Sequence, residues 1–271
     1  MNLRKRLHEV RLRWRHHEYH IGDARIDGPI SERRQSIVRH VVILHGGGRI
    51  GRNRRFATAQ LELARLKAVA KAAGGTLNDV VLALCSASLR RYLAEQDALP
   101  TAPLVAMVPV SIRGKDDAGG GNAVGAILAS LATTTEDPAE RLAAIVASTT
   151  TAKQQLQGMS PQAILQYSAM LIAPMMLQMI PGAAGRLRPP FNIVISNVPG
   201  PEQPLYFRGA RLEATYPMGP LIEGSGLNVT ALTNLGHVDV GILACPDLVP
   251  DVADLARGFE AGVAELCASV P

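Results

Sequence analysis

The sequence predicts a mixed α/β fold (α+β), in which helices pack on a mixed sheet. Strand-like and helix-like segments succeed one another along the chain, and hydrophobic residues make up 47% of it. The strand-like segments are too irregularly spaced for a barrel of βα units. This much apolar material excludes a disordered or fibrous protein, and the length of 271 residues allows one large domain or two small ones.

The first predicted elements of the body lie between residues 56 and 96. Residues 56–63 alternate polar and apolar side chains, which predicts a half-buried strand, and residues 64–73 have a helical pattern that two glycines end. A long helix is predicted from Thr76 to about Gln96. Thr76 and Asp79 fit a capping box at its start, so a structural cap is the default interpretation. The functional alternative is that Asn78, in the first turn, directs its amide toward a ligand.

The later elements complete the mixed pattern. Pro138, preceded by two acidic residues, favours a helix N-terminus, and we expect this helix and the next to form an antiparallel pair. Asn234-Leu235-Gly236 predicts a hairpin turn. The expected segments are strands 104–110 and 124–132, helices 138–157 and 161–180, strand 191–198, short strands 205–207 and 211–216, hairpin strands 226–233 and 237–244, and a closing helix 250–268.

The charge distribution divides the chain into a basic, weakly ordered arm at residues 1–48 and a folded domain at residues 49–271. Residues 1–55 contain 14 of the 28 Lys and Arg residues but only 5 of the 23 acidic ones, and six of the seven histidines. The start lacks an apolar segment and does not fit a secretory signal. The most apolar window, residues 163–180, contains Pro174 and several polar side chains. It therefore predicts a buried or membrane-surface helix rather than a membrane span.

Cysteine and aromatic content narrow the expected partners. The three cysteines form no C-x-x-C pair, so we expect neither disulfides nor a thiolate zinc site, and we expect a reducing cytoplasmic location. Aromatic residues make up only 4% of the chain, which leaves little capacity for stacking on bases. No nucleic acid is expected as a partner.

Two motifs near residue 46 suggest other functions. Residues Gly46–Gly51 fit G-x-G-x-x-G and follow an apolar run, which is the pattern of a nucleotide-binding protein. The helix that should follow is missing, so a flexible glycine joint is the preferred interpretation. Residues 41–48 also resemble the oxyanion-hole strand of an α/β-hydrolase, but no G-x-S-x-G pentapeptide accompanies them.

Several histidines are candidate metal ligands or bases. His16, His17 and His20 could bind a metal if they were helical, but no acidic or thiolate ligand is fixed nearby, which favours a solvated surface. His237 and Asp239 alternate onto one face of a predicted strand, which allows a His–carboxylate pair. Their place beside a hairpin turn favours an exposed, structural position instead.

Five segments carry a family resemblance. They are RIGRNRRFATAQLEL (49–63), LKAVAKAAGGTLNDVVLALCSASLRRYL (66–93), VPVSIR (108–113), FNIVISNVPGP (191–201) and GHVDVGILACPDLVPD (236–251). In this order they resemble the C-terminal half of the bacterial wax ester synthase/diacylglycerol acyltransferase family. The resemblance extends over the chain from about Arg49 to the C-terminus. Asn78 and Asp79 match a second motif of this family, and Asn197, Pro199 and Gly200 match a loop typical of its C-terminal half.

The resemblance implies a chloramphenicol-acetyltransferase-like architecture, shared with condensation and plant acyltransferase domains. Two similar halves of such an enzyme enclose a tunnel that acyl-CoA enters from one side and a fatty alcohol or diacylglycerol from the other. Acyl-CoA is a substrate, and no cofactor is implied. A histidine of an HHxxxDG motif on the N-terminal half deprotonates the acceptor hydroxyl, which attacks the thioester carbonyl.

The N-terminal motif of this chain departs from that pattern. His16-His17 begins like HHxxxDG, but Ile21 and Gly22 stand where the motif has Asp and Gly. His17 and His237 are therefore candidates to which no catalytic role is assigned. Loss of a positioned base costs about 10²–10⁴ in rate. We accordingly expect a truncated C-terminal portion of an acyl-CoA-dependent O-acyltransferase, with little activity alone, unless a separate N-terminal half pairs with it.

The alternative function is a non-catalytic interaction module. An apolar wall facing an absent half would be exposed and would favour self-association or lipid association. Residues 1–55 would be attracted to anionic membrane lipids by about 1 kcal/mol for each basic residue near the surface. The expected location is then peripheral, on the inner face of the membrane or on lipid inclusions. Acyl chain length and the acceptor alcohol are left open.

Overall fold

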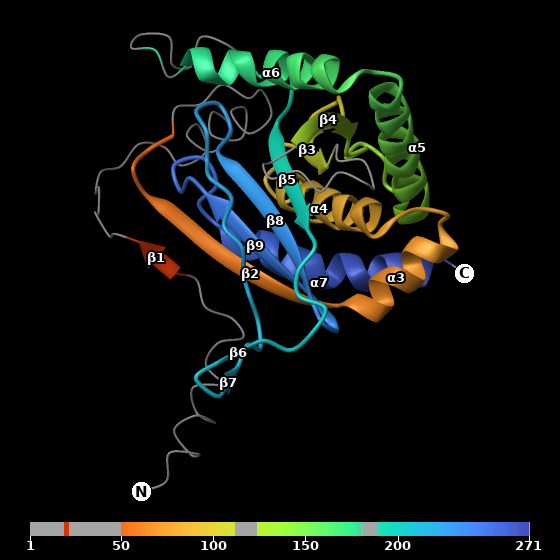
Figure 1. The fold of residues 1–271 in the computed structure, drawn as a ribbon, viewed down its shortest axis with the longest axis vertical. Coiled ribbons are helices and arrows are strands. Elements are labelled where there is room, and N and C mark those ends of the chain that lie inside the picture. Colours follow the sequence, from red (N-terminus) through yellow and green to blue (C-terminus); the bar gives the residue numbers. More distant parts are fainter. Residues whose placement is uncertain (1–18, 22–49, 112–123, 179, 181–188, 271) are drawn as a thin grey trace, which may run out of the picture.

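The computed structural model describes residues 19–21, 50–111, 124–178, 180 and 189–270. A seven-stranded sheet of order β1-β2-β9-β8-β5-β3-β4 forms its centre, with helices on both faces (Figure 1). This arrangement confirms the predicted mixed α/β class. The elements are β1 (Tyr19–Ile21), β2 (Arg54–Glu62), α3 (Leu63–Ala72), α4 (Leu77–Ala94), β3 (Val105–Ser111), β4 (Val124–Ser130), α5 (Pro138–Gln157), α6 (Pro161–Gln178), β5 (Ile193–Val198), β6 (Tyr206–Phe207), β7 (Ala210–Arg211), β8 (Leu227–Asn234), β9 (His237–Ala244) and α7 (Val252–Ser269).

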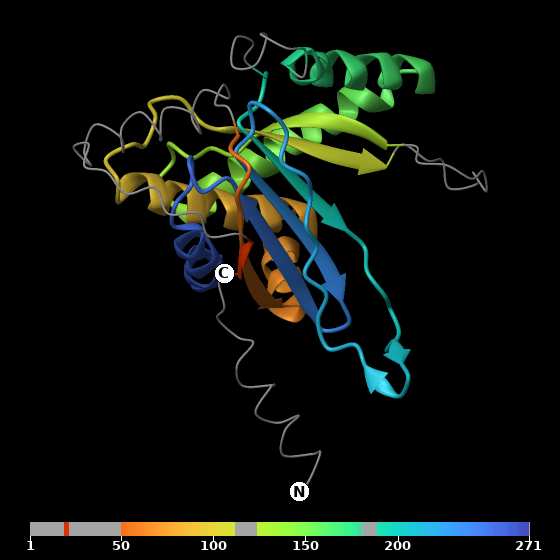
Figure 2. The same cartoon turned by 90° about the vertical axis from the view of Figure 1, so that its left-hand side faces the viewer.

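The sheet is mixed because β5 lies between two parallel neighbours. β5 pairs in parallel with β3 on one side and β8 on the other, whereas the other neighbouring strands are antiparallel. The short hairpin of β6 and β7 forms a separate two-stranded sheet. Figure 2 shows this hairpin projecting from the opposite end of the molecule to α6.

Alternation along the strands separates two apolar clusters. The large cluster includes Ala106 and Val108 of β3 and lies against α4, α5 and α7. Met107 between them belongs to a smaller cluster with Leu171 of α6 and Phe191. Because neighbouring residues of a strand point to opposite faces, the two clusters lie on opposite faces of the sheet. The main core thus lies under α4 and α7, and α6 covers the smaller cluster.

Two expectations about the later elements are wrong. α6 is not the antiparallel partner of α5: it lies across the end of the sheet formed by β3 and β4 (Figure 1), where Leu171 joins the smaller apolar cluster. The physical reason is that the apolar surface of β3 and β4 buries this side of α6. The strand expected at 211–216 ends at Arg211. The residues after it cross the face of β8 and β9 without pairing as a strand.

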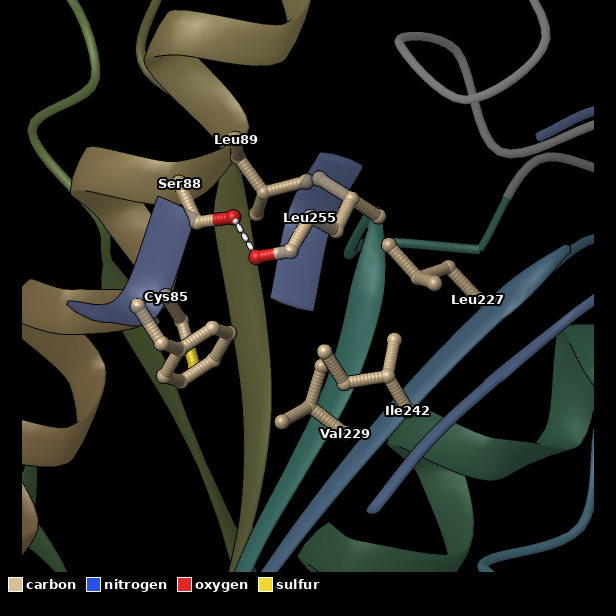
Figure 3. Close-up of a pocket in the computed structure, with 8 residues that line it drawn as sticks. Cys85, Ser88, Leu89, Leu227, Val229, Ile242 and Leu255 are labelled. Carbon is tan, nitrogen blue, oxygen red and sulfur yellow. Dashed lines mark hydrogen bonds between the residues drawn. The ribbon is translucent and has the colours of Figure 1, made fainter. Parts of the chain in front are cut away.

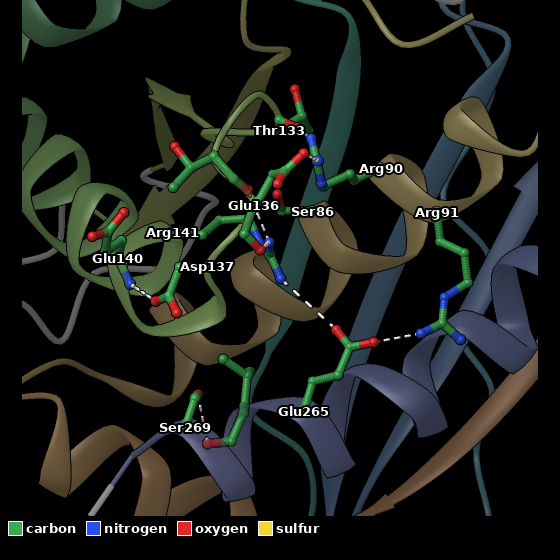
Figure 4. Close-up of polar contacts among 12 residues, drawn as sticks. Ser86, Arg90, Arg91, Thr133, Glu136, Asp137, Glu140, Arg141, Glu265 and Ser269 are labelled. Carbon is green, nitrogen blue, oxygen red and sulfur yellow. Dashed lines mark hydrogen bonds and ion pairs between the residues drawn. The ribbon is translucent and has the colours of Figure 1, made fainter. Parts of the chain in front are cut away.

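Buried polar contacts tie the start of α5 to α4 and α7 (Figure 4). The Arg141 side chain is only 2% exposed, and its Nη1 donates to the carbonyl oxygens of Thr135 and Glu136 at 3.0 and 2.9 Å. Its Nη2 lies 3.9 Å from Glu265 of α7, which also pairs with Arg91 of α4. Burial lowers the pKa of Arg141, and the charge of Glu265 opposes this effect.

The described helices differ in length and apolar content. None of them alone is long and apolar enough to cross a membrane, but α3 and α4 together pass by length and composition, with a 101° bend between them.

Candidate functional site

The start of α4 is held by a complete capping box. The Asp79 carboxylate accepts from the backbone N–H of Thr76 at 2.8 Å, and the Asp79 N–H donates to the Thr76 hydroxyl oxygen at 3.4 Å. The second carboxylate oxygen accepts from the Thr149 hydroxyl of α5 at 2.7 Å. Asp79 is only 2% exposed. The predicted structural cap is therefore confirmed, and Asp79 also joins α4 to α5.

Asn78 lies next to this cap in a different environment. Its side chain is half-buried in the first turn of α4. No hydrogen bond to it is found within the described part of the chain, so no described side chain occupies its amide. Asn78 therefore stays a candidate for contact with a ligand.

The end of β5 contains the other family-motif residues. Asn197 lies opposite Ala231 of β8, and its Oδ1 is buried without a hydrogen-bond partner among the described residues. Pro199 is exposed, and the Gly200 N–H donates to the Thr233 hydroxyl at 2.9 Å. A Cβ atom at Gly200 would lie 1.8 Å from the Thr233 carbonyl oxygen. This close contact between the loop and β8 requires glycine.

Asp239 anchors a segment that crosses the sheet. We call residues 212–222 the strap, and its Thr215 N–H donates to Asp239 at 2.7 Å. Gln60 of β2 and Asn234 of β8 donate to the same carboxylate at 2.8 and 3.1 Å. These are its donors among the described residues. His237 is exposed at the start of β9 and is not one of them, so the His–carboxylate pair considered from the sequence does not form.

Close backbone contacts hold the strap along β8 and β9. A Cβ atom at Gly241 of β9 would lie 1.8 Å from the Pro217 carbonyl oxygen, and one at Gly219 would lie 2.2 Å from Oδ1 of Asn228. The Asn234 amide also donates to the Glu213 carbonyl at 3.2 Å. The strap therefore covers the face of β8 and β9 that points away from α7, with little free space beneath it.

A cavity between α4, α7 and the sheet is too small for a substrate. It has a volume of about 10 Å³ and is lined by Cys85, Ser88, Leu89, Leu227, Val229, Ile242, Leu255 and Phe259 (Figure 3). The Ser88 hydroxyl on its wall already donates to the Leu255 carbonyl at 2.7 Å. This volume is at the lower limit for one water molecule, and its wall is mostly apolar. The cavity is thus a packing defect of the core and not an acyl tunnel.

The described residues do not contain the other motifs considered from the sequence. His16, His17 and residues 41–48 lie outside them, and His20 lies in β1, of which only the backbone is described. Among the described residues, no group of three or more His, Cys, Asp and Glu side chains could hold a metal ion.

Sequence reasoning missed the network around Asp239. The available signal was a carboxylate flanked by valines in an apolar strand, at Val238-Asp239-Val240. A buried carboxylate in such a strand needs several donors. The sequence could not identify them, because Gln60 precedes Asp239 by 179 residues.

Comparisons with known proteins agree with the resemblance found in the sequence. The family description "WS/DGAT C-terminal domain" matches residues 120–266, and "Wax ester synthase/diacylglycerol acyltransferase catalytic domain" matches residues 40–81. A probable diacyglycerol O-acyltransferase, tgs2, of Mycobacterium tuberculosis is 45% identical over 219 residues, which are 80% of this chain and 48% of that protein. The O-acyltransferase WSD of Acinetobacter baylyi is 43% identical over 212 residues, which are 78% of this chain and 46% of that protein. The chain thus spans about half the length of these relatives.

Solved structures show the same relationship. A wax ester synthase/diacylglycerol acyltransferase from Marinobacter aquaeolei VT8 superposes with a TM-score of 0.71 at 37% identity, over 90% of this chain and 57% of that one. A nonribosomal peptide synthetase, FmoA3, has a TM-score of 0.53 at 15% identity over 88% of this chain and 25% of that one, and shows the fold alone. The predicted chloramphenicol-acetyltransferase-like fold is confirmed. Because the C-terminal domain of the family matches residues 120–266, the chain belongs to the wax ester synthase/diacylglycerol acyltransferase family.

Proposed function

We propose that this chain provides the C-terminal half of an acyl-CoA-dependent O-acyltransferase whose acceptor is a diacylglycerol or a long-chain alcohol. The observation that supports this most strongly is the match of residues 120–266 to the C-terminal domain of the family. The names of the relatives support the reaction class, since they are a diacyglycerol O-acyltransferase and an O-acyltransferase.

The proposed reaction needs a base that the described core does not contain. The acceptor hydroxyl attacks the thioester carbonyl carbon, the C–S bond breaks, and the hydroxyl proton leaves with CoA as the free thiol. Beyond residue 55 the sequence has a single histidine, His237, and it is exposed at the start of β9. We therefore propose that a motif of the HHxxxDG type on a separate half supplies the base, and that this 271-residue chain has little turnover alone.

The contribution of this chain would be to shape and position one side of the site. Asn78 has an amide without a described partner, and Asn197 has a buried oxygen without one. Both belong to the family-motif positions, and both are fixed by their elements, α4 and β5. An amide can donate to a carbonyl oxygen or accept from a hydroxyl, which is the chemistry of a substrate-orienting group.

The proposal is tested with a chimera. The C-terminal half of the Acinetobacter baylyi O-acyltransferase WSD is replaced by residues 50–271, and the release of free CoA from palmitoyl-CoA is measured with diacylglycerol and with hexadecanol. We expect turnover by the chimera and none above background by the 271-residue chain alone. An inactive but folded chimera would contradict the proposed function. Turnover by the chain alone that His17→Ala abolishes would contradict the proposed dependence on a separate half.

The Asn78→Ala variant of the same chimera tests the orienting role. We expect a fall in kcat of about tenfold or more, because a substrate-orienting contact is lost. The free energy of unfolding should change by less than about 0.5 kcal/mol, because no described contact is broken. Unchanged kcat would show that Asn78 does not contact the substrate.

A further inference from the structure

α6 presents an apolar face that no described part of the chain covers. Leu165, Met170, Met176 and Leu177 are 48–65% exposed, and Ile180 just beyond the helix is 54% exposed. At 100° per residue, the four helical positions fall within about 140° of arc, and Ile180 follows the end of the helix. We call them the outer face of α6. Such a row of large apolar side chains marks an interaction surface.

The opposite side of α6 fixes the direction in which the outer face points. Ile164 and Leu171 are buried, and Leu171 packs in the smaller apolar cluster with Phe191 and Met107. The hydroxyl of buried Ser168 accepts from the backbone N–H of Ala126 in β4 at 3.1 Å. α6 is therefore held on the sheet by one face, and the exposed outer face lies on its other side. The helix itself lies at the edge of the molecule (Figures 1 and 2).

The charges in and near α6 help to decide whether its outer face binds a protein or a phospholipid surface. α6 contains no Lys, Arg, Asp or Glu, and the sequence contains no Asp or Glu between Glu140 and Glu202. The helix itself thus offers no charged group to a protein partner, and residues 141–201 contain no acidic group to repel phospholipid headgroups. An uncharged apolar helix face that lies parallel to the surface suits the boundary between headgroups and acyl chains.

The size of the outer face argues against a second copy of the chain as its partner. Five side chains that are each about half exposed offer on the order of 500 Å², whereas a stable interface buries about 800 Å² on each partner. A membrane surface has no such minimum, since partitioning grows with every apolar group that leaves water.

We propose that the outer face of α6 docks the protein on the surface of a phospholipid bilayer or monolayer. The inference goes beyond the proposed function, although the two agree, because diacylglycerols and long-chain alcohols reside in a lipid phase. Docking through an uncharged face is expected to persist on zwitterionic lipid and at high salt. This separates it from attraction through the basic residues of 1–55, which salt screens.

The first test places a fluorescent probe on the outer face. The sequence has one tryptophan, Trp14, so Trp14→Phe combined with Met170→Trp gives a single reporter on α6. With vesicles of phosphatidylcholine alone, in about 1 M NaCl where the Debye length is about 3 Å, we expect a blue shift of the emission. We also expect quenching by brominated acyl chains. Emission that does not change with vesicles would overturn the proposal.

The second test removes the apolar character of the face. The triple variant Leu165→Gln, Met170→Gln, Leu177→Gln should bind the same vesicles about tenfold more weakly or worse. The matched control is Leu205→Gln, Tyr206→Gln, Phe207→Gln, since these residues are equally exposed on the β6–β7 segment. Unfolding midpoints establish that both variants fold.

Each outcome of the second test decides the proposal. Vesicle binding that the control abolishes and the α6 variant retains would overturn it. Dissociation of a dimer by the α6 variant, with unchanged vesicle binding, would assign the face to a second copy. Vesicle binding is measured without acyl-CoA or acceptor, so its failure is distinguishable from a failure of the proposed acyl transfer.

Discussion

Asp79 is occupied by structural contacts on both of its carboxylate oxygens. It caps α4 through Thr76 and accepts from Thr149 of α5. A family motif residue can therefore be required for folding without touching a substrate. Its neighbour Asn78 has no such described contacts. We therefore expect Asp79 to stabilise the fold and Asn78 to contact the substrate.

The Asp79→Ala variant tests this distinction. We expect the free energy of unfolding to fall by about 1–3 kcal/mol, because the Thr76 N–H loses its acceptor and the Thr149 hydroxyl keeps only the Val146 carbonyl. Urea denaturation measures the change, with Asn78→Ala as the matched control. A variant of normal stability would contradict the structural role of Asp79.

Cys85 gives the protein a pH dependence at the alkaline end. Burial in the core raises the pKa of its thiol far above its ordinary value. The unfolded chain releases this proton above about pH 8.5 and the folded chain retains it, so stability falls as pH rises, by about 1.4 kcal/mol for each unit from this group. Urea denaturation under reducing conditions from pH 7 to 10 should show a steeper fall for the wild type than for Cys85→Ala. Parallel curves would show that the thiol is not buried in its protonated form.

At the scale of elements, a buried carboxylate anchors the strap. Asp239 is fully buried and accepts from Gln60, Thr215 and Asn234, which come from β2, the strap and β8. Through these contacts it sets the path of the chain from the β6–β7 hairpin back to β8.

The Asp239→Asn variant should loosen the strap. The amide nitrogen that replaces one oxygen would face hydrogen-bond donors, so we expect a loss of about 1–3 kcal/mol. Hydrogen exchange at the Thr215 N–H should rise more than exchange in α7. Gln60→Ala removes the donor to Oδ1 but leaves Thr215 and Asn234 on Oδ2, so exchange at the Thr215 N–H should rise less than in Asp239→Asn. Equal exchange of the Thr215 N–H in wild type and Asp239→Asn would contradict the anchoring role.

The loop after β5 needs glycine at position 200 because it approaches the backbone of β8 closely. Gly200→Ala places a methyl group against the Thr233 carbonyl oxygen, and we expect a loss of about 1–3 kcal/mol from the forced shift. Gly236→Ala is the matched control, because nothing lies within 4 Å of a Cβ atom there. Thermal unfolding compares the two. Similar midpoints would show that the loop moves freely away from β8.

At the scale of the whole molecule, Arg141 and Glu265 connect the three helices α4, α5 and α7. Arg141→Ala leaves the carbonyl oxygens of Thr135 and Glu136 without their buried donor, and we expect a loss of about 2–4 kcal/mol. Arg91→Ala should cost less than about 1 kcal/mol, because its pair with Glu265 is partly exposed. Chemical denaturation of both variants makes the comparison. Equal losses would show that burial of Arg141 does not determine its contribution.

Local patterns in the sequence predicted most elements because their causes are local. The capping box at Thr76 and the proline at the start of α5 require only neighbouring residues, and both are found where expected. The antiparallel pairing of α5 and α6 and a strand at 211–216 were wrong, because both depend on distant partners. Of the site positions, Asp79 and Gly200 have structural explanations, whereas roles for Asn78 and Asn197 stay predictions and His17 lies outside the described residues.

The sequence by itself determined most of the strands and helices, where α4 and α5 begin, and to which family the chain is similar. It did so because periodicity, caps and motifs are contained in short runs of residues. Only the tertiary structure decided which face of α6 is buried, and that Asp239 meets Gln60 and not His237. The reason is that burial and hydrogen bonding depend on residues far apart in the sequence, and the donors to Asp239 lie 5, 24 and 179 positions away from it.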